Sequence, residues 1–271
     1  MLKQRVFTAA LLLPMVMAAI FALPAQWFLI LVAIILLGGS WEYGHLAGFT
    51  GHTSGYLLIL VQAIILLALF VNMADWGPGI LMYLSFACIA WLLMFIRLPL
   101  YRPGKQPDPS YRIISCATAI VSVTTGWFAL GWIRTQLDGS WLILLLLLIV
   151  WAADTGAYFA GKTFGKRKLA PQISPGKTRA GLWGGLIAAP LMALLAASLM
   201  PLAPIEPSGL ILLSLVTALA SVGGDLVISL HKRTSGIKDS GDLLPGHGGI
   251  LDRLDSLLAA APFFALGLLV G

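Results

Sequence analysis

Long apolar runs, separated by short polar segments, extend along the whole chain. A helix that crosses a bilayer needs about 20 mostly apolar residues, and proline or glycine marks the ends of several runs, as at Pro24 and Pro99. The pattern predicts nine membrane-spanning helices, at residues 6–22, 27–44, 56–74, 79–98, 113–132, 141–160, 181–203, 208–230 and 254–270. We therefore expect an all-α polytopic membrane protein.

The composition supports this interpretation and limits what else the chain contains. Hydrophobic residues make up 59% of the chain and charged residues 10%, whereas soluble domains carry about 25% charge. The spans leave no room for a large soluble domain, so we treat residues 1–271 as one domain whose site is built from helix ends and loops. Cys88 and Cys116 lie in apolar stretches, which argues against a disulfide framework or a zinc site.

Basic residues set the predicted orientation. With a cytoplasmic N-terminus, all but Arg134 of the 17 Lys and Arg residues fall on the cytoplasmic side, as the positive-inside rule requires. The formal net charge of +6 therefore describes one face of a membrane protein. We infer no nucleic-acid binding from it.

Two acidic residues interrupt predicted spans. Acids in a bilayer are costly and usually mark function, and Asp154 and Asp225 lie near the cytoplasmic ends of the sixth and eighth spans, among small residues. Each one alone is also consistent with simple pairing to a basic neighbour; two together favour a shared polar site. Glu42 is expected to have a structural role, pairing with His45 one turn along the same helix.

The polar run from Ser229 to Asp255 is the richest in chemistry. Its glycines allow backbone N–H groups to approach phosphate oxygens, and Asp252 and Asp255 stand one helical turn apart where the last span begins. Carboxylates, cations and flexible backbone together suit a magnesium-bound polyphosphate. The candidate phosphate-binding cations are Lys177, Lys232, Arg233, Lys238 and Arg253.

A second basic, glycine-bearing segment covers residues 161–178 and ends in Ser174-Pro-Gly-Lys-Thr178. Its last residues resemble the end of a Walker A loop, but Pro171 stands where that motif has its first glycine, and we expect no strand before it. A P-loop is therefore rejected. The segment is either a positive-inside anchor or, in the sharper interpretation, a binding site for an anionic ligand.

In both segments the chain resembles the phosphatidate cytidylyltransferases, also called CDP-diacylglycerol synthases. The family's signature is met by Ser229, Lys232-Arg233, Lys238-Asp239, Pro245, His247-Gly248-Gly249, Asp252-Arg253 and Asp255. A second block is met by Asp154, Ala157-Tyr158, Gly161, Gly165, Lys168-Leu169, Pro171 and Ser174 to Thr178. Three places depart from the pattern: Arg179-Ala180 replaces an aromatic residue and an acid or Gln, Ile228 replaces an acid, and His231 replaces an apolar residue.

The resemblance implies a nine-span enzyme of the bacterial inner membrane that transfers a cytidylyl group from CTP to phosphatidic acid, giving CDP-diacylglycerol and pyrophosphate. It implies dependence on Mg2+, with room for a second cation. Asp225 and Asp252 are then expected to hold the metal, with Asp154 or Asp255 either completing the shell or orienting a basic residue. Membrane lipids are the expected surroundings, and a homodimer is compatible with the family.

Site roles follow from the same resemblance, with the active site on the cytoplasmic side. Residues 136–271 are expected to carry the catalysis and residues 1–135 to form a scaffold and the lipid entrance. The expected catalytic residues are Asp225, Asp252, Lys232, Arg233, Lys238, His247 and Arg253. The expected substrate-binding residues are Lys177, Ser174, Thr178, Ser229, Gly248, Gly249, Asp154 and Asp255.

Several alternatives stay open. Ser229 either holds phosphate or bonds the helix carbonyl four residues back, and His247 is either a base or phosphate donor or a backbone-ordering residue. His231 is expected to be incidental. Because of the departures, a diverged paralogue using CTP with another lipid acceptor is kept as an alternative function. A transporter is disfavoured, since no internal repeat is visible and the acids crowd toward one face.

Overall fold

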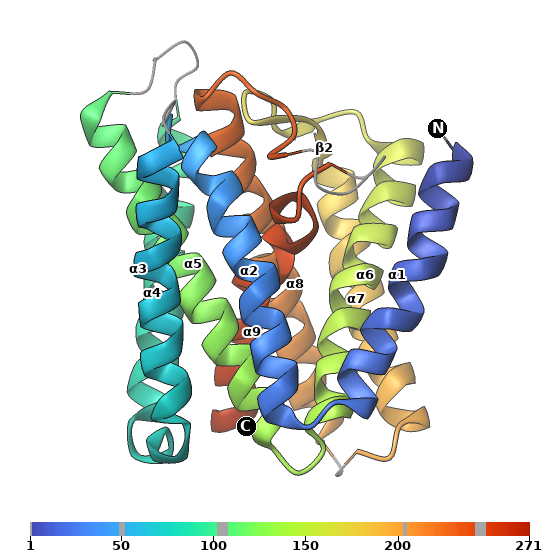
Figure 1. The fold of residues 1–271 in the computed structure, drawn as a ribbon. Coiled ribbons are helices and arrows are strands. Elements are labelled where there is room, and N and C mark those ends of the chain that lie inside the picture. Colours follow the sequence, from blue (N-terminus) through green and yellow to red (C-terminus); the bar gives the residue numbers. More distant parts are fainter. Residues whose placement is uncertain (1, 49–51, 102–107, 203–204, 242–247) are drawn as a thin grey trace.

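The computed structural model describes residues 2–48, 52–101, 108–202, 205–241 and 248–271. Within them the chain forms nine α-helices and one short β-hairpin (Figure 1). The helices are α1 (Leu2–Ala22), α2 (Ala25–Leu46), α3 (His52–Val71), α4 (Ile80–Ile96), α5 (Pro109–Thr135), α6 (Gly139–Phe164), α7 (Arg179–Leu199), α8 (Pro207–Thr234) and α9 (Leu251–Val270). The strands are β1 (Lys168–Ala170) and β2 (Ser174–Thr178). Three single 3-10 turns lie at Met73–Asp75, Gly77–Gly79 and Leu98–Leu100.

Each predicted apolar run falls on one of these helices, so the prediction of an all-α polytopic membrane protein is confirmed. Among the described residues, seven helices are long and apolar enough to cross a membrane: α2 and α4 to α9. The apolar parts described for α1 and α3 are shorter, at Ala10–Ala22 and Gly55–Val71. The chain is thus a multi-pass membrane protein.

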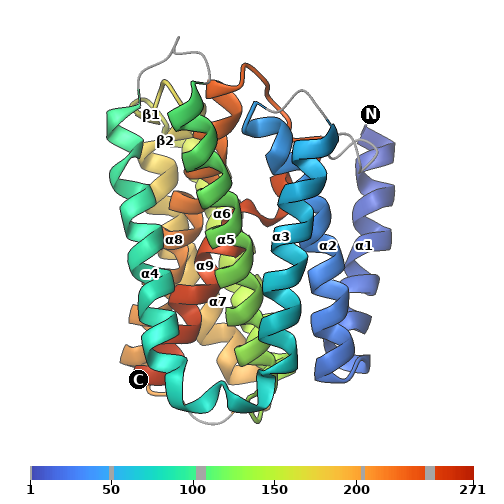
Figure 2. The same cartoon turned by 60° about the vertical axis from the view of Figure 1, so that its left-hand side comes forward.

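The helices run side by side in alternating directions, so that their connections lie at two opposite ends of the bundle (Figures 1 and 2). The N-terminus and the β-hairpin lie at one end and the C-terminus at the other. We call the first of these the hairpin end. The end of α8 and the beginning of α9 both lie there, which brings the predicted signature residues to one face of the protein.

Burial separates the helices into an inner and an outer group. More than half of the apolar window of α5 and of α8 is buried, whereas α4 and α7 bury less than a third of theirs. The largest fully buried side chains include Trp91, Trp127, Tyr43 and Phe264. Exposed leucines and aromatics on α4 and α7, such as Phe86 and Trp183, face outward, as expected where lipid is the surrounding solvent.

The β-hairpin was not predicted. The expectation that no strand precedes the Lys177-Thr178 pair is wrong, because β1 and β2 pair in antiparallel fashion, with Lys168 opposite Thr178 and Ala170 opposite Ser174. A five-residue segment containing Pro and Gly has little strand propensity of its own, so its conformation comes from tertiary contacts. At its tip, Ile173 packs on α8 against Leu226 and Leu230.

Hydrogen bonds fix the hairpin at both ends. The Nε atom of Arg233 on α8 donates to the carbonyl oxygen of Ile173 at 3.1 Å. At the other end, the hydroxyl oxygen of Thr178 accepts a bond of 3.0 Å from the N–H of Gly181 and so caps α7. The hairpin is therefore held between α7 and α8 and forms one wall of the site described below.

Helices α6 and α7 meet through small residues at a spacing of four, a pattern that allows close approach of helices in membranes. Gly156 and Ala160 on α6 face Gly184 and Ala188 on α7. A side-chain carbon at Gly184 would collide with Ala160 and lie 2.7 Å from the carbonyl oxygen of Gly156. This contact sets the distance between Asp154 on α6 and the hairpin that leads into α7.

Gly184→Ala is expected to lower the free energy of unfolding by about 1–3 kcal/mol, because overpacking forces the two backbones apart. Gly209→Ala is the matched control: a side-chain carbon there meets nothing within 4 Å, and replacing glycine in a helix gains up to about 1 kcal/mol. Thermal unfolding in detergent micelles measures both variants. Equal melting temperatures for the two would contradict the close-packing argument.

Candidate active site

A polar cavity of about 410 Å3 lies at the hairpin end between α6, the β-hairpin and the start of α7. Its volume falls within the range of roughly 300–1,000 Å3 common to small-molecule sites. Several of its walls are glycines, which lets a ligand approach the backbone. The ionisable and hydroxyl groups in its lining are Asp154, Tyr158, Lys162, Lys168, Lys177 and Thr178. Three lysines against one acid make the cavity suited to an anion.

The first charged cluster joins this cavity to α8. The Nζ atom of Lys177 lies 2.6 Å from Oδ2 of Asp225, and both side chains are about a quarter exposed. The hydroxyl of Ser229 donates to Oδ1 of the same carboxylate at 3.0 Å. Asp154 on α6 has both Lys177 and Asp225 as electrostatic neighbours. Lys177 on β2 therefore binds one of the two predicted acids, Asp225, and lines the same cavity as the other, Asp154.

The second cluster lies where α9 begins. Lys232 on α8 binds Oδ1 of Asp252 at 2.6 Å, with only 12% and 10% of the two side chains exposed. The other carboxylate oxygen accepts bonds from the N–H groups of Ser240 and Gly249, at 2.9 and 3.2 Å. Two described residues of the polar segment before α9 thus bond Asp252 through their backbone. Gly248 adopts a positive φ of 80° there, a conformation that glycine adopts without strain.

Asp255 links the two clusters. It is buried one turn after Asp252, accepts a bond of 2.7 Å from the N–H of Ser256, and has Asp225, Lys232 and Lys177 as electrostatic neighbours. Helices α8 and α9 approach closely at this point, because Gly224 on α8 has no side chain that would collide with the carbonyl oxygen of Asp255 on α9. The predicted convergence of the ends of α8 and α9 is thereby explained.

Glu42 has the structural role that the sequence predicted, but through other partners. Its predicted partner His45 is wrong: Glu42 is 2% exposed, whereas His45 faces outward. The carboxylate instead accepts bonds from the hydroxyl of Ser240 at 2.7 Å and from the N–H groups of Ile250 and Leu251 at 2.8 and 2.9 Å. The N–H groups that begin a helix lack partners within it and carry its positive dipole end. The Glu42 carboxylate on α2 supplies both the missing acceptor oxygens and a negative charge at the beginning of α9.

The remaining predicted residues take other positions. Ser174 pairs with Ala170 within the hairpin, and Arg233 bonds the hairpin backbone as described above. Lys238 and Arg253 are exposed at the hairpin end. His247 lies outside the described residues.

His231, expected to be incidental, is a buried structural residue. Its Nδ1 atom lies 2.7 Å from the hydroxyl of Ser115 and 3.3 Å from that of Tyr111. The Tyr111 hydroxyl also lies 3.0 Å from the carbonyl oxygen of Leu46. This departure from the family pattern therefore ties α8 to α2 and α5 just before Lys232.

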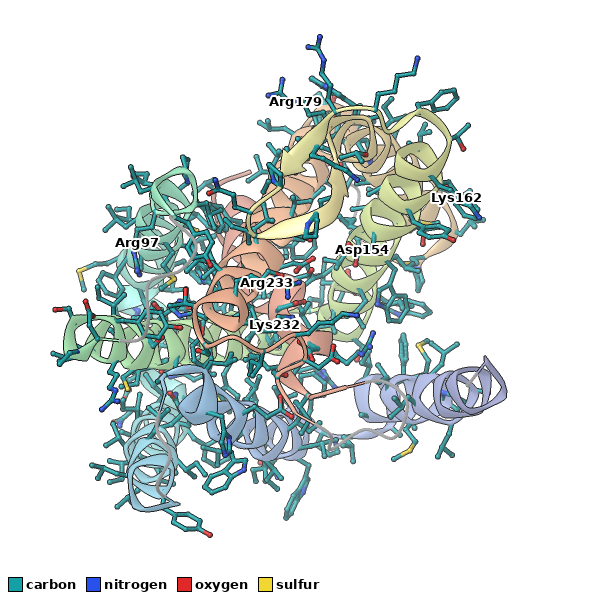
Figure 3. All side chains as sticks on the ribbon, turned by 90° about the horizontal axis from the view of Figure 1, so that it is seen from above. Arg97, Asp154, Lys162, Arg179, Lys232 and Arg233 are labelled. Atoms are coloured by element: carbon teal, nitrogen blue, oxygen red, sulfur yellow. The ribbon has the colours of Figure 1, made fainter. Side chains whose placement is uncertain are left out.

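The basic residues form an inner and an outer group when the hairpin end is viewed along the bundle. Figure 3 shows Asp154, Lys232 and Arg233 around the middle of this end, whereas Arg179 lies at its rim. Lys162 and Lys168 line the cavity but were not among the predicted site residues. For Lys162, its position in the basic segment was the only available signal. Lys168 also stands in the second family block, which separates it from Lys166 and Arg167 beside it.

The carboxylates fit a hard divalent cation by chemistry. In the described part of the chain, no three acids, histidines or cysteines converge into a metal site of their own. Mg2+ usually binds one or two carboxylates and completes its shell with water and substrate phosphates. Asp225 and Asp252 are the donors of this kind that adjoin the lysines of the site.

Comparison with known proteins shows the family of the chain. The model of the cytidylyltransferase family matches residues 3–270. The chain belongs to this family. It is 38% identical to a phosphatidate cytidylyltransferase of Pseudomonas aeruginosa, with 98% of this chain and 96% of that protein covered. It is 35% identical to one of Haemophilus influenzae, with 98% of both covered. A protein of Escherichia coli named only as uncharacterized, YnbB, is 34% identical over 70% of this chain and 67% of its own length.

Glu42→Gln is expected to destabilise this cytidylyltransferase-family protein by about 1–3 kcal/mol, because the amide group presents a donor to N–H groups that then lose their acceptor. Glu206→Gln is the control: Glu206 stands at the N-cap of α8, is exposed and makes no side-chain cap bond. Thermal unfolding of both purified variants measures the difference. A melting temperature of the Glu42 variant equal to that of the control would show that the buried carboxylate does not hold α9.

Proposed function

We propose that the chain transfers the cytidylyl group of CTP to phosphatidic acid, giving CDP-diacylglycerol and pyrophosphate. The observation that carries the proposal is the pairing of Lys177 with Asp225 and of Lys232 with Asp252 at the ends of two adjacent membrane helices, beside a cationic cavity. A polyphosphate requires cations that are already positioned, and a lipid acceptor requires a site at membrane-surface depth. The names of the two nearly full-length relatives point to the same reaction.

The reaction needs no covalent intermediate with the protein. A phosphate oxygen of phosphatidic acid attacks the α-phosphorus of CTP, and the bond from that phosphorus to the bridging oxygen breaks in line, so pyrophosphate leaves with the electron pair. The protein's task is to position both phosphates and to stabilise charge on their oxygens. Lys162, Lys168 and Lys177 in the cavity are placed for the polyphosphate.

Asp225 and Asp252 would hold Mg2+. Asp154 and Asp255, which are both electrostatic neighbours of Asp225, would add negative charge beside the ion. When bound, the ion supplies positive charge that offsets the charge on the phosphates and favours loss of pyrophosphate. Ser229 orients the Asp225 carboxylate through its hydrogen bond. The Glu42 carboxylate orients the first turn of α9, and with it Asp252.

The topology is part of the proposal. Nine spans with a cytoplasmic N-terminus put the hairpin end in the cytoplasm, where CTP is available, and agree with the distribution of Lys and Arg. The membrane would then be the bacterial inner membrane. A homodimer stays a prediction.

The direct test uses the purified protein with radiolabelled CTP, phosphatidic acid and Mg2+. A CDP-lipid product and stoichiometric pyrophosphate are expected, and omission of Mg2+ should abolish both. A panel of other lipid phosphates and polyprenyl phosphates separates this activity from that of a diverged paralogue. Product with another acceptor but none with phosphatidic acid would overturn the assignment of the acceptor.

Asp225→Asn and Asp252→Asn should each lower turnover by about 10²-fold or more, because both remove charge where the phosphates react. Asp75→Asn is the control, since Asp75 is exposed in the turn Met73–Asp75. This turn joins α3 to α4 at the end of the bundle opposite the hairpin (Figure 1). Turnover is measured beside thermal unfolding, so that loss of fold is detected. Near-normal turnover in a folded Asp225 or Asp252 variant would remove that residue from the site.

A further inference from the structure

A second cavity, of about 650 Å3, lies next to the polar one and has a different character. Its lining is almost entirely apolar and comes from α4, the turn after it, the β-hairpin, α8, α9 and one residue of α7. No step of the proposed reaction uses these residues. Leu92 on α4 and Leu219 on α8 are each 49% exposed, so the cavity opens sideways toward the bilayer rather than into water.

The two cavities share part of their walls. Leu169 in the hairpin, Leu182 on α7 and Val222 on α8 line both. Val222 precedes Asp225, the acid bound to Lys177, by one helical turn. A single molecule with a phosphate and a hydrocarbon chain is therefore able to occupy the polar cavity and the apolar one together.

The depth of the apolar cavity matches half a bilayer. Along α8 its lining extends from Leu226, near the hairpin tip, to Val216. At a rise of 1.5 Å per residue, a separation of ten positions corresponds to about 15 Å, which is half of a hydrocarbon core of about 30 Å. Figure 2 shows this side of the bundle, with α4 and α8 close together and the hairpin above them. A lipid chain that starts at headgroup depth ends at the deep end of such a cavity.

Aromatic residues stiffen the wall opposite the hairpin. Phe95 on α4 and Phe263 on α9 stack with ring centroids 6.2 Å apart, and both line the cavity. Gly223 permits this packing, because a side-chain carbon there would lie 2.6 Å from the Phe95 ring. The wall is thus preformed, and a preformed apolar wall selects its occupant by length and shape.

From this geometry we infer that the apolar cavity binds one acyl chain of the phosphatidic acid substrate, and that Leu92 and Val216 determine which chain lengths are accepted. The inference rests on the proposed function for the identity of the lipid. Continuity with the phosphate-binding cavity favours the substrate over a structural lipid. The occupant's second chain remains in the surrounding bilayer, reached through the opening between Leu92 and Leu219.

The test compares dioleoyl- and dioctanoyl-phosphatidic acid as substrates of the full-length protein in mixed micelles. Leu92→Trp fills the cavity from α4, and Val216→Trp fills its deep end from α8. Each is expected to shift the ratio of kcat/KM for the two lipids about tenfold toward the short one, since small changes of fit in an apolar pocket alter discrimination by about 10- to 200-fold. The KM for CTP should not change.

The controls are residues of similar exposure outside the cavity. Leu93, the next residue after Leu92, is 60% exposed, and Leu212, one turn before Val216, is 64% exposed. The control variants are Leu93→Trp and Leu212→Trp. Neither lines the cavity, so both should keep the wild-type ratio. If Leu92→Trp and Leu93→Trp have the same ratio of kcat/KM for the two lipids, whether or not it differs from the wild-type ratio, the inference is overturned.

Photolabelling separates failure of this inference from failure of the proposed function. Phosphatidic acid carrying a diazirine at the end of one chain is expected to label peptides of α4 and α8 without CTP, and dioleoyl-phosphatidic acid should compete. Competition by dioleoyl-phosphatidylcholine of equal strength would indicate a structural lipid and overturn the inference. If the wild-type protein makes no CDP-lipid, the proposed function fails, and labelling that phosphatidic acid displaces still supports the acyl-chain site.

Discussion

The structure depends on one constraint: carboxylates at the ends of apolar helices must be paired. An unpaired charge at low dielectric costs several kcal/mol, so Asp225 and Asp252 each hold a lysine at 2.6 Å. Each pair also joins separate parts of the chain. Lys177 on β2 binds Asp225 on α8, and Lys232 on α8 binds Asp252 on α9. The same charges that suit phosphate chemistry therefore assemble the hairpin end. Cations that bind carboxylates in this way are already placed for the oxygens of a phosphate.

Glu42 shows how the first half of the chain contributes. The beginning of α9 has N–H groups without helical partners, and it lies in an interior where water does not satisfy them. A carboxylate from α2 does so, and it also bonds Ser240, whose own N–H group bonds Asp252. Residues 1–135 are thus more than a scaffold around the site. They fix the position of an acid that lies more than two hundred residues later in the sequence.

How much the sequence predicts depends on whether the signal is local. The apolar runs are local, and all of them correspond to helices. The choice of Asp154, Asp225 and Asp252 as candidates at the hairpin end was possible from the sequence, because acids are rare in apolar helices and each of them stands out by itself. The hairpin was not, because its strands are stabilised by Arg233 and by packing of Ile173 on α8 rather than by propensity. Glu42 carried a usable signal, an acid beside Gly38, Gly39 and Ser40, but its partners lie far away in sequence.

The long helix α8 explains why polar and apolar chemistry meet at one place. Its last turns carry Asp225, Ser229 and Lys232, and its middle forms the floor of the apolar cavity. Both surfaces belong to one rigid element, which His231 ties to α2 and α5. Covalent bonds limit how far a lipid phosphate lies from the start of its acyl chain, so a site for both gains from being built on one rigid helix. Along α8 itself, the separation between Asp225 and the apolar residues from Val216 to Val222 is set by the helix and does not change.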